Sequence, residues 1–418
     1  MIFSAAVDYI NGLIIDRYHG KFLAKIALFS SIFINLGLLS TFKYSNFIVE
    51  NVNALLGTSF DIPSFALPIG ISFYTFQTIS YVIDIYRGQV KAQRSFFKFF
   101  MYVSLFHQLV AGPIVRYSHI AHGIDHRKFD INDIVSGITR FCVGLSKKVL
   151  IANVAGSFVV SYMDADPATL SVLGAWFGVF MFSIQIYFDF SGYSDMAIGL
   201  GKMFGFHYFE NFNYPYIAKS ATDFWRRWHI SLGGFFRDYV YIPLGGNRKR
   251  GYLNLLIVWF LTGLWHGSSW NFILWGLFYA LLIMIERAFL LKLLSKIPSV
   301  FAHCYLIGAT LIAWTIFYFS DLSSFVSYFK VMFGFSPNPI NDLQLSLALF
   351  NNGIWILFAI FFCLPIIPAF KKFISMYFDA NFLIILNYLQ TFLNIAMLLI
   401  CTSMLIGESY NPFLYFRF

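Results

Sequence analysis

The 418-residue sequence is 59% apolar and 21% aromatic, and only 12% of its residues are charged. Ordinary soluble domains carry about 25% charged residues, so this composition excludes a soluble domain. It predicts an all-α protein that crosses a membrane several times. The formal net charge is +9, but Lys and Arg form short clusters between apolar runs, as in cytoplasmic membrane loops. A nucleic-acid-binding protein would carry a basic domain or stripe, so we exclude that class.

The first apolar runs of spanning length are 22–42, flanked by lysines, and 65–83, followed by Asp84 and Arg87. The next apolar stretch, 96–115, contains His107-Gln108 and then Ala111-Gly112-Pro113. Proline lacks a backbone N–H and clashes with the preceding helical turn, so a plain helix cannot continue there. We therefore expect a re-entrant or kinked segment.

The polar stretch 116–133 carries His119, His122 and His126, whose spacing could place three imidazoles on one helical face. Gly123 and the surrounding charges favour a solvated loop over a metal site. We therefore predict no metal centre. The four cysteines are far apart and lack CxxC spacing, so we expect packing residues rather than disulfides or metal ligands.

The moderately apolar run 131–154 contains Arg140, Lys147 and Lys148. It either lies near the interface or spans with its lysines reaching toward the headgroups. The run 170–188 is a clear span, and Gly174 and Gly178 have the small-xxx-small spacing that permits close helix contact. We expect it to end near Asp189.

The stretch 210–250 is polar, basic and aromatic, and is too charged to span. By the positive-inside rule, its Lys and Arg residues place it on the cytoplasmic face. Thr222 or Asp223 is expected to cap a short helix that carries Trp225 and His229 on one side and ends at Gly233-Gly234. The segment is either an interfacial anchor or an entrance for an anionic substrate.

The run 252–285 contains no Asp, Glu, Lys or Arg and holds one histidine, His266. As one helix it would measure ~51 Å, well beyond the ~30 Å hydrocarbon core, so it must break, tilt or turn back. The expected break is at Gly267-Ser268-Ser269, where the serines can bond to unpaired carbonyls. An imidazole beside such backbone is a functional candidate, and the competing interpretation is a histidine hydrogen-bonded to a neighbouring helix.

Further spans are expected over 304–319, 354–370 and 382–406, with an extramembrane loop over 321–344 that contains Pro337 and Pro339. Together with the earlier runs they predict roughly nine to twelve membrane helices plus re-entrant and interfacial segments. We expect one multi-pass domain over 1–418.

Several strings resemble the membrane-bound O-acyltransferase superfamily, and within it the branch that O-acetylates alginate or peptidoglycan. The strings are DFWRRWHISLGGFFRDYVYIPLGGNRK and TGLWHGSSWNFILWG, supported by GISFYTFQTISYVIDIYRG, LVAGPIVR, IYFDFSGYSDMAIGLGKMFGF, ENFNYPY and NPFLYFRF. The best-matching core covers about 70–290. Relatives usually carry further hydrophobic helices ahead of the region that 7–16 resembles, so this sequence starts late relative to them. The string over 241–247 favours polysaccharide or peptidoglycan acetylation over D-alanylation of teichoic acid, although both branches share the WHISL and WHG strings.

The resemblance implies that His266 is the catalytic histidine and that His229 is the family's second characteristic histidine. Acyl transfer from a thioester needs a base for the hydroxyl proton and donors for the oxyanion, and a neutral imidazole suits the first task. Oxyanion donors could come from Ser268, Ser269, Asn271 or the Trp265 indole. Arg226, Arg227 and the cluster 248–250 could attract the phosphates of acetyl-coenzyme A. His229 would orient that donor or help the proton leave.

The resemblance further implies an acetyl group taken from a cytoplasmic thioester, with no bound cofactor, and passed across the inner membrane. A partner acetyltransferase outside the cytoplasm would deliver it to a polysaccharide or peptidoglycan. Two other classes stay open: a proton-coupled transporter or flippase that uses His266 as its relay group, and a scaffold for polymer assembly. Detection of covalent acyl transfer separates the enzyme from the transporter, and a scaffold would function without His266.

Overall fold

The computed structural model describes residues 1–63, 65–378, 380–407 and 413–414, and within them the chain is helical with no strand. Among the described residues, six helices are long and apolar enough to cross a membrane: Phe22–Leu56, Ile131–Met163, Val172–Met203, Ser299–Tyr318, Leu343–Phe362 and Ile385–Ile406. Shorter helices pack beside them. The protein is therefore a multi-pass helical membrane protein, as the composition predicts.

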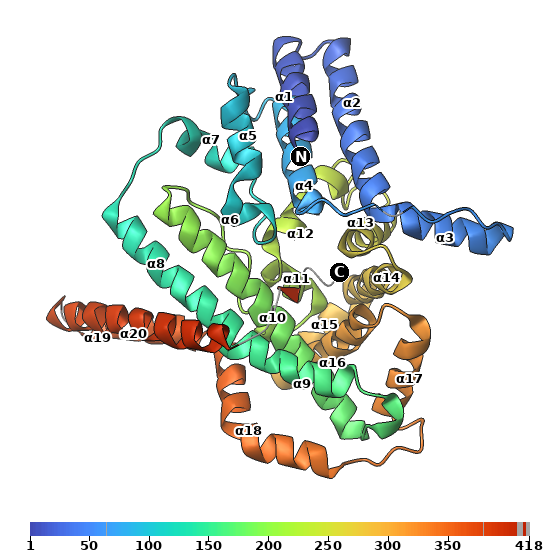
Figure 1. Cartoon of the computed structure of the whole chain (residues 1–418), viewed down its shortest axis with the longest axis vertical. Helices are drawn as coiled ribbons and strands as arrows, with labels where there is room; N and C mark the ends of the chain where they lie inside the picture. The colour runs from blue at the N-terminus through green and yellow to red at the C-terminus, as the bar shows by residue number, and fades with distance from the viewer. Residues whose placement is uncertain (64, 379, 408–412, 415–418) are drawn as a thin grey trace.

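The N-terminal helices form a bundle of their own. α1 (Ile2–Arg17), α2 (Phe22–Leu39) and α4 (Ile71–Tyr86) stand side by side at the top of Figure 1, with α5 (Phe96–Ser104) against α1. Their contact is polar as well as apolar, because the buried Asp8 carboxylate accepts hydrogen bonds from Ser31 Oγ at 2.5 Å and Asn35 Nδ2 at 2.8 Å. α2 continues through a π-helical turn, η1 (Ser40–Tyr44), into α3 (Ser45–Leu56), which projects sideways from the molecule.

Two long helices cross the centre of the molecule side by side (Figure 1). One comprises α8 (Ile131–Ser146), the π-helical η2 (Lys147–Asn153) and α9 (Val154–Met163), and the other is α10 (Val172–Met203). A Cβ added at Gly199 would lie 2.6 Å from the carbonyl oxygen of Gly137, so glycine lets the two backbones approach closely.

The prediction that Lys147 and Lys148 extend toward the lipid headgroups is wrong. Lys147 Nζ lies 2.6 Å from Asp195 Oδ2, and Lys148 Nζ lies 2.5 Å from Asp189 Oδ1. These acids belong to α10, which continues through Asp189 to Met203 instead of ending near it. The lysines turn inward because a buried carboxylate requires a counter-charge.

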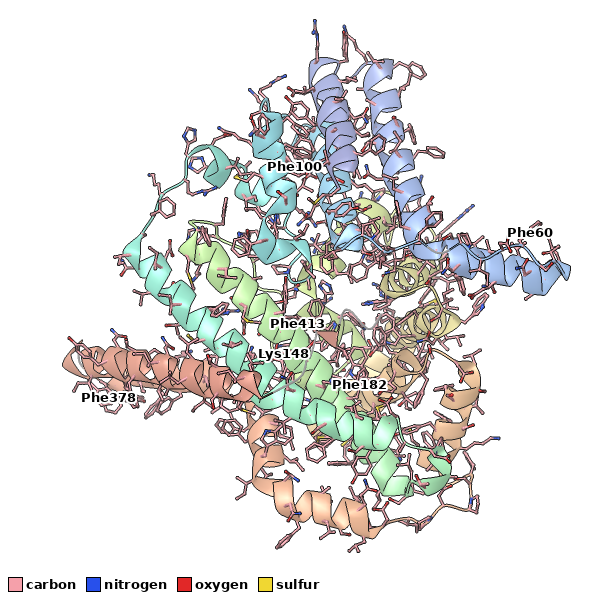
Figure 2. All side chains as sticks on the ribbon, in the orientation of Figure 1. Phe60, Phe100, Lys148, Phe182, Phe378 and Phe413 are labelled. Atoms are coloured by element: carbon pink, nitrogen blue, oxygen red, sulfur yellow. The ribbon has the colours of Figure 1, made fainter. Side chains whose placement is uncertain are left out.

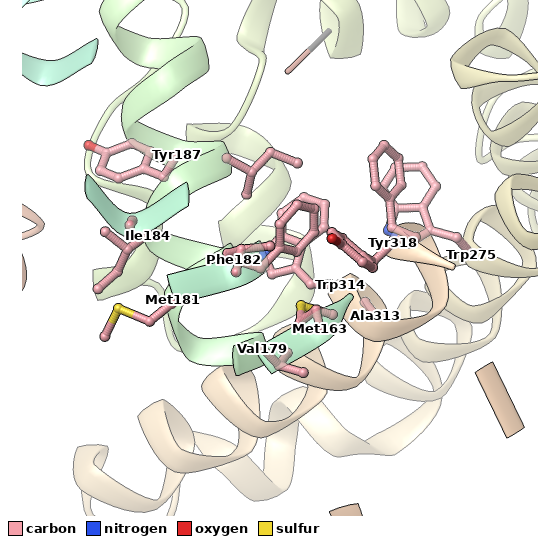
Figure 3. Close-up of a cluster of buried hydrophobic side chains, with 14 of the residues drawn as sticks. Met163, Val179, Met181, Phe182, Ile184, Tyr187, Trp275, Ala313, Trp314 and Tyr318 are labelled. Carbon is pink, nitrogen blue, oxygen red and sulfur yellow. The ribbon is translucent and has the colours of Figure 1, made fainter. Parts of the chain in front are cut away.

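The second half packs an aromatic core between α10 and the C-terminal helices. α13 (Gly251–His266) and α14 (Trp270–Ile285) form a hairpin, and α16 (Ser299–Tyr318) packs against α14 and α10. Figure 3 shows Phe182 of α10, Trp314 and Tyr318 of α16 and Trp275 of α14 in this core. The Trp314 ring lies 6.3 Å from both Phe182 and Trp275.

The remaining elements complete the fold. They are α6 (Phe106–Leu109), α7 (Tyr117–Asp125), α11 (Ala221–Arg227), α12 (Ile230–Phe236), α15 (Leu291–Leu294), α17 (Leu322–Met332), α18 (Leu343–Phe362), α19 (Ile366–Tyr377) and α20 (Ala380–Ile406), with the turns η3 (Pro167–Thr169), η4 (Pro215–Ile217), η5 (Arg237–Tyr241) and η6 (Glu286–Leu290). In Figure 1, α18 runs along the bottom and α19 and α20 project to the left.

Several expected boundaries differ from the structure. α4 begins at Ile71 rather than 65, because Gly70 takes a left-handed conformation with φ 74°. α7 occupies the expected loop 116–133, since Tyr117, Ile120 and Ile124 bury one helical face. α17 lies within the expected loop 321–344, where Asp321 caps its first turn. The kink expected within 96–115 is confirmed, as α5 and α6 end before irregular backbone at Ala111-Gly112-Pro113.

Candidate functional site

The break that carries His266 lies where the sequence predicts it, between α13 and α14. A Cβ at Gly263 would lie 2.3 Å from Phe272 O, and one at Gly267 would lie 2.1 Å from the Phe272 ring. Glycine at these two positions therefore lets the chain reverse tightly. The reversal leaves the last carbonyls of α13 without partners inside their own helix.

Residues from the N-terminal bundle supply those partners. Lys43 Nζ donates to the carbonyl oxygens of Trp265 and His266, the latter at 3.1 Å, and Tyr44 Oη donates to Leu264 O at 2.7 Å. Both donors lie in or beside the π-helical turn of the Phe22–Leu56 helix, a kind of turn that often marks functional sites. The turn thus caps the helix that ends at His266.

The imidazole of His266 faces a small aromatic cavity. Its ring lies 4.9 Å from the Trp275 ring and 5.3 Å from the Phe317 ring, and its Nε2 is buried without a hydrogen-bond partner among the described residues. The Nε1 atoms of Trp265 and Trp275 are likewise buried, and no described residue hydrogen-bonds to them. The cavity, of about 50 Å³, is lined by Ala111, Ile186, Asp189, Phe190, Tyr193, Trp228, Trp265, His266, Trp275, Trp314, Phe317, Phe413 and Leu414.

The C-terminal residues reach the wall of this cavity. Leu414 N donates to Asp189 Oδ2 at 2.7 Å, and Lys148 Nζ lies 4.9 Å from the centre of the Phe413 ring. Figure 2 shows Phe413 beside Lys148 at the centre of the molecule. The buried Asp189–Lys148 pair therefore holds Phe413 and Leu414 of that C-terminal string next to the His266 cavity. Sequence reasoning quoted that string for its resemblance and had no signal for its position.

His229 lies between two short helices rather than on one. α11 ends at Arg227, and α12 begins at Ile230 and continues through Gly233-Gly234 to Phe236, so the single helix expected to carry Trp225 and His229 is wrong. The N-cap of α11 is Ser220 rather than Thr222 or Asp223. His229 takes the left-handed conformation with φ 44° and ψ 55°, which is uncommon for non-glycine residues and frequent at functional sites.

The imidazole of His229 is buried and held by Asn211. Asn211 Oδ1 lies 3.3 Å from His229 Nδ1, 3.1 Å from Ser231 N and 2.8 Å from Ser231 Oγ. The other ring nitrogen, Nε2, is buried without a hydrogen-bond partner among the described residues. Burial lowers the pKa of His229 to about 3, so its imidazole is neutral near pH 7.

His229 faces a second cavity of about 240 Å³. Two cations border it, Arg237 and Arg287. Arg287 Nη1 donates to Asn247 Oδ1 at 2.8 Å and Tyr241 Oη at 3.2 Å, and no carboxylate of the described residues pairs with it. The remaining lining residues are Trp225, Leu232, Gly233, Phe236, Tyr241, Leu255, Val258, Trp259 and Thr262.

Trp265 lies between the two histidines. Its ring centroid is 6.0 Å from that of His229 and 5.0 Å from that of His266. Phe76 of α4 stacks on the same indole at 5.7 Å, and Phe73 meets it edge-on at 5.6 Å. The N-terminal bundle therefore packs on the indole that contacts both imidazoles.

The other predicted site residues have different environments. Asn271 Nδ2 donates to Phe317 O at 3.0 Å and its Oδ1 accepts from Ser269 Oγ. These bonds stabilise the turn between α13 and α14, and Asn271 lines neither cavity. Ser268 lines neither cavity. Arg227 pairs with Asp223 at 3.0 Å, Arg226 is exposed, and neither arginine lines a cavity. Sequence reasoning missed Lys43, Asn211 and Arg287, because only the fold brings them to the histidines.

His119 and His122 lie in α7, and His126 directly follows it. His119 packs edge-on against Phe209 at 4.5 Å, and no group of three His, Cys, Asp or Glu in the described part of the chain is placed to hold a metal ion. The four cysteines are free.

Comparison with known proteins fits this arrangement. The chain is 42% identical over 320 residues to the probable alginate O-acetylase AlgI of Azotobacter vinelandii, covering 74% of this chain and 63% of that protein. It is 33% identical over 387 residues to the peptidoglycan O-acetyltransferase of Helicobacter pylori, covering 85% and 73%. The teichoic acid D-alanyltransferase of Bacillus subtilis is 29% identical over 234 residues, covering 53% and 59%.

The chain thus spans somewhat less than two thirds of the length of the alginate relative that it matches. The sequence profile of the membrane-bound O-acyltransferase family matches residues 89–329, a range that contains both histidines and both cavity-lining arginines. The chain belongs to the membrane-bound O-acyltransferase family.

Proposed function

We propose that the protein is a membrane O-acyltransferase that moves an acetyl group from a cytoplasmic thioester to hydroxyls of an extracytoplasmic polysaccharide or peptidoglycan. The observation that carries the proposal is the pair of histidines facing two cavities across Trp265. One cavity is bordered by arginines and the other by aromatic rings. Such a division suits a reaction in which an anionic donor and a hydroxyl acceptor approach from different sides.

His266 is the proposed base. Its unpartnered Nε2 takes the proton of the attacking hydroxyl in the aromatic cavity while the new C–O ester bond forms. As the C–S bond breaks, the proton passes from the imidazolium to the departing thiolate, so the histidine returns to its neutral form. The free indole N–H groups of Trp265 and Trp275 border the same cavity and would stabilise the developing oxyanion.

Acetyl-coenzyme A is the proposed donor, and its phosphates would lie against Arg237 and Arg287 rather than the expected Arg226 and Arg227. Guanidinium groups bind phosphate oxygens in bidentate geometry, and the partners of Arg287 within the described part of the chain are the neutral side chains of Tyr241 and Asn247. The thioester arm would extend from there past His229. The attacking hydroxyl would belong to the partner acetyltransferase on the other side of the inner membrane, which carries the acetyl ester and transfers it to a hydroxyl of the polymer.

Two relatives support acetyl as the acyl group, because they carry O-acetylase or O-acetyltransferase in their names. D-alanyl transfer is the alternative within the family, supported by the lower identity to the Bacillus subtilis protein. Two cavities, each lined by one of the two histidines, are also compatible with a proton-coupled transporter. Covalent acyl transfer by the purified protein would exclude transport alone.

The test is His266→Ala in cells that display the acetylated polymer. We expect acetate release from isolated polymer to fall to background while the variant accumulates in the membrane. His126→Ala is the matched control, because His126 is exposed and lies outside both cavities, and it should retain wild-type acetylation. Normal acetylation in the His266→Ala cells would remove His266 from the catalytic role.

A further inference from the structure

The Asn211 amide has a defined orientation next to His229. Its Oδ1 lies 3.1 Å from the backbone nitrogen of Ser231, which always carries a hydrogen and can only donate. The side-chain atom that faces this N–H must therefore be the oxygen. On the opposite side the amide nitrogen donates to Ser194 Oγ at 3.2 Å, which fits the same orientation.

This orientation decides which ring nitrogen of His229 carries the proton. His229 Nδ1 lies 3.3 Å from the same amide oxygen, and an unprotonated Nδ1 there would place two lone pairs against each other. Nδ1 must therefore be the donor, which leaves the lone pair of the neutral ring on Nε2. Ser231 Oγ does not change this assignment, since it lies nearer to Asn211 Oδ1, at 2.8 Å, than to Nδ1, at 3.4 Å.

Asn211 also holds the backbone on which the imidazole stands. Its carbonyl oxygen accepts from Ile230 N at 3.0 Å, directly after the left-handed residue His229. Ile114 N in turn donates to Ser231 Oγ at 2.9 Å. Asn211 thus contacts the two residues that follow His229 as well as the ring itself, and these contacts restrict rotation of the ring.

We infer that Asn211 is a positioning residue that keeps Nε2 of His229 unprotonated, so that this nitrogen acts as a hydrogen-bond acceptor. The Nε2 lone pair is then available to an N–H group of a ligand in the arginine-bordered cavity. The inference rests on the proposed function for the ligand, a thioester whose pantetheine arm carries amide N–H groups. It excludes neutral His229 as a hydrogen-bond donor to the thioester carbonyl, because Nε2 carries no hydrogen. His229 then binds the thioester substrate, and other groups stabilise the oxyanion.

The tautomer can be measured without any activity. In solid-state NMR of the membrane-embedded protein labelled with ¹³C and ¹⁵N histidine, only Nδ1 is bonded directly to Cγ, so a one-bond N–Cγ correlation identifies it. The His229 signals are those lost in His229→Gln. We expect Nδ1 to resonate as a protonated nitrogen and Nε2 as an unprotonated one. The reverse pattern in the wild-type protein would overturn the inference, whatever the fate of the proposed function.

Variants then test whether Asn211 sets the tautomer. Asn211→Leu should give a mixed or reversed pattern, whereas Asn211→Asp, whose carboxylate still accepts from Nδ1, should keep it. Asn213→Leu is the matched control, because Asn213 is exposed two residues away. An unchanged spectrum in Asn211→Leu would overturn the inference. If that variant does not accumulate, a loss of the Nδ1–H pattern in Asn211→Asp would overturn it as well.

Kinetics provide the functional readout. In Asn211→Leu, His229 should lose its hydrogen bond to the thioester substrate. We expect this loss to raise KM for acetyl-coenzyme A by about 3- to 10-fold with kcat unchanged. Asn211→Asp should restore a KM near that of the wild type. A fall in kcat with normal KM would contradict the positioning role. If no variant or wild-type protein turns over acetyl-coenzyme A, the proposed function fails while the NMR result stands.

Discussion

Two histidines share contact with one tryptophan and yet face different cavities. The sequence singles out His266 because it is the lone imidazole of an uncharged run, and the family resemblance adds His229. Their separate environments could not be predicted, because the helix expected to carry His229 ends at Arg227 and the chain turns there with positive φ. That turn depends on Asn211, a tertiary contact without a local sequence signal.

Arg287 offers a prediction at this scale. Arg287→Gln should raise KM for acetyl-coenzyme A by about 5- to 10-fold with little change in kcat, because it removes a charge-assisted contact to phosphate. The side chain is exposed, so the difference from wild type should shrink in high salt. Initial rates against donor concentration at two ionic strengths measure both effects.

Arg226→Gln is the matched control for this prediction. Arg226 is also exposed and basic, but it lines neither cavity. Equal KM values for the two variants would show that the basic surface acts only through its overall charge.

At the scale of elements, the N-terminal bundle and the α13–α14 hairpin act as one unit. Lys43 and Tyr44 satisfy three carbonyls at the end of α13, and Phe73 and Phe76 pack on Trp265. The residues 89–329 that match the family do not include any of these four side chains. The helices before that range are therefore part of the site rather than an appendage.

Lys43→Met tests this coupling. Removing the ammonium leaves two backbone carbonyls without their donor, at a cost of about 1–3 kcal/mol for each buried unsatisfied group. We expect a lower thermal unfolding midpoint in detergent and a larger loss of transfer rate than the unfolded fraction explains. Lys25→Met, an exposed lysine of the same helix, should change neither quantity. Wild-type stability and rate in Lys43→Met would show that the cap is dispensable.

Long-range pairing limits what can be predicted about the elements. Apolar runs located spans such as Val172–Met203 and Ser299–Tyr318 but placed the span Leu343–Phe362 at 354–370, whereas the Gly267-Ser268-Ser269 break follows from run length and glycine alone. The inward direction of the Lys147 and Lys148 side chains could not be predicted in this way. Their partners Asp189 and Asp195 lie on another helix, which was expected to stop at Asp189. Burial of an ion pair between two helices leaves no periodic trace in either sequence.

For the whole molecule, the proposal requires the arginine-bordered cavity to open toward the cytoplasm. The density of Lys and Arg in 210–250 predicts this orientation, and the cavity borders the same segment. Lys249→Cys in a Cys304→Ser background provides the probe, since Lys249 and Cys304 are exposed and the other cysteines are buried.

We expect a membrane-impermeant maleimide to leave Lys249→Cys unlabelled in intact cells and to label it after the cells are opened. The Cys304→Ser background without the new cysteine controls for labelling elsewhere. Labelling from outside intact cells would show that Lys249 faces the outside of the cell, and this orientation would contradict the proposed path of the acetyl group.

The most direct test of the central claim is the rate of acetyl transfer against acetyl-coenzyme A concentration for His229→Ala, His266→Ala and the double variant. If His266 is the base, its loss lowers kcat by ~10²–10⁴, and more donor cannot recover the rate. If His229 binds the donor, its loss raises KM with kcat unchanged, and the double variant shows both effects. A His229→Ala enzyme with normal apparent affinity, a collapsed kcat and no further loss in the double variant would contradict this division of labour.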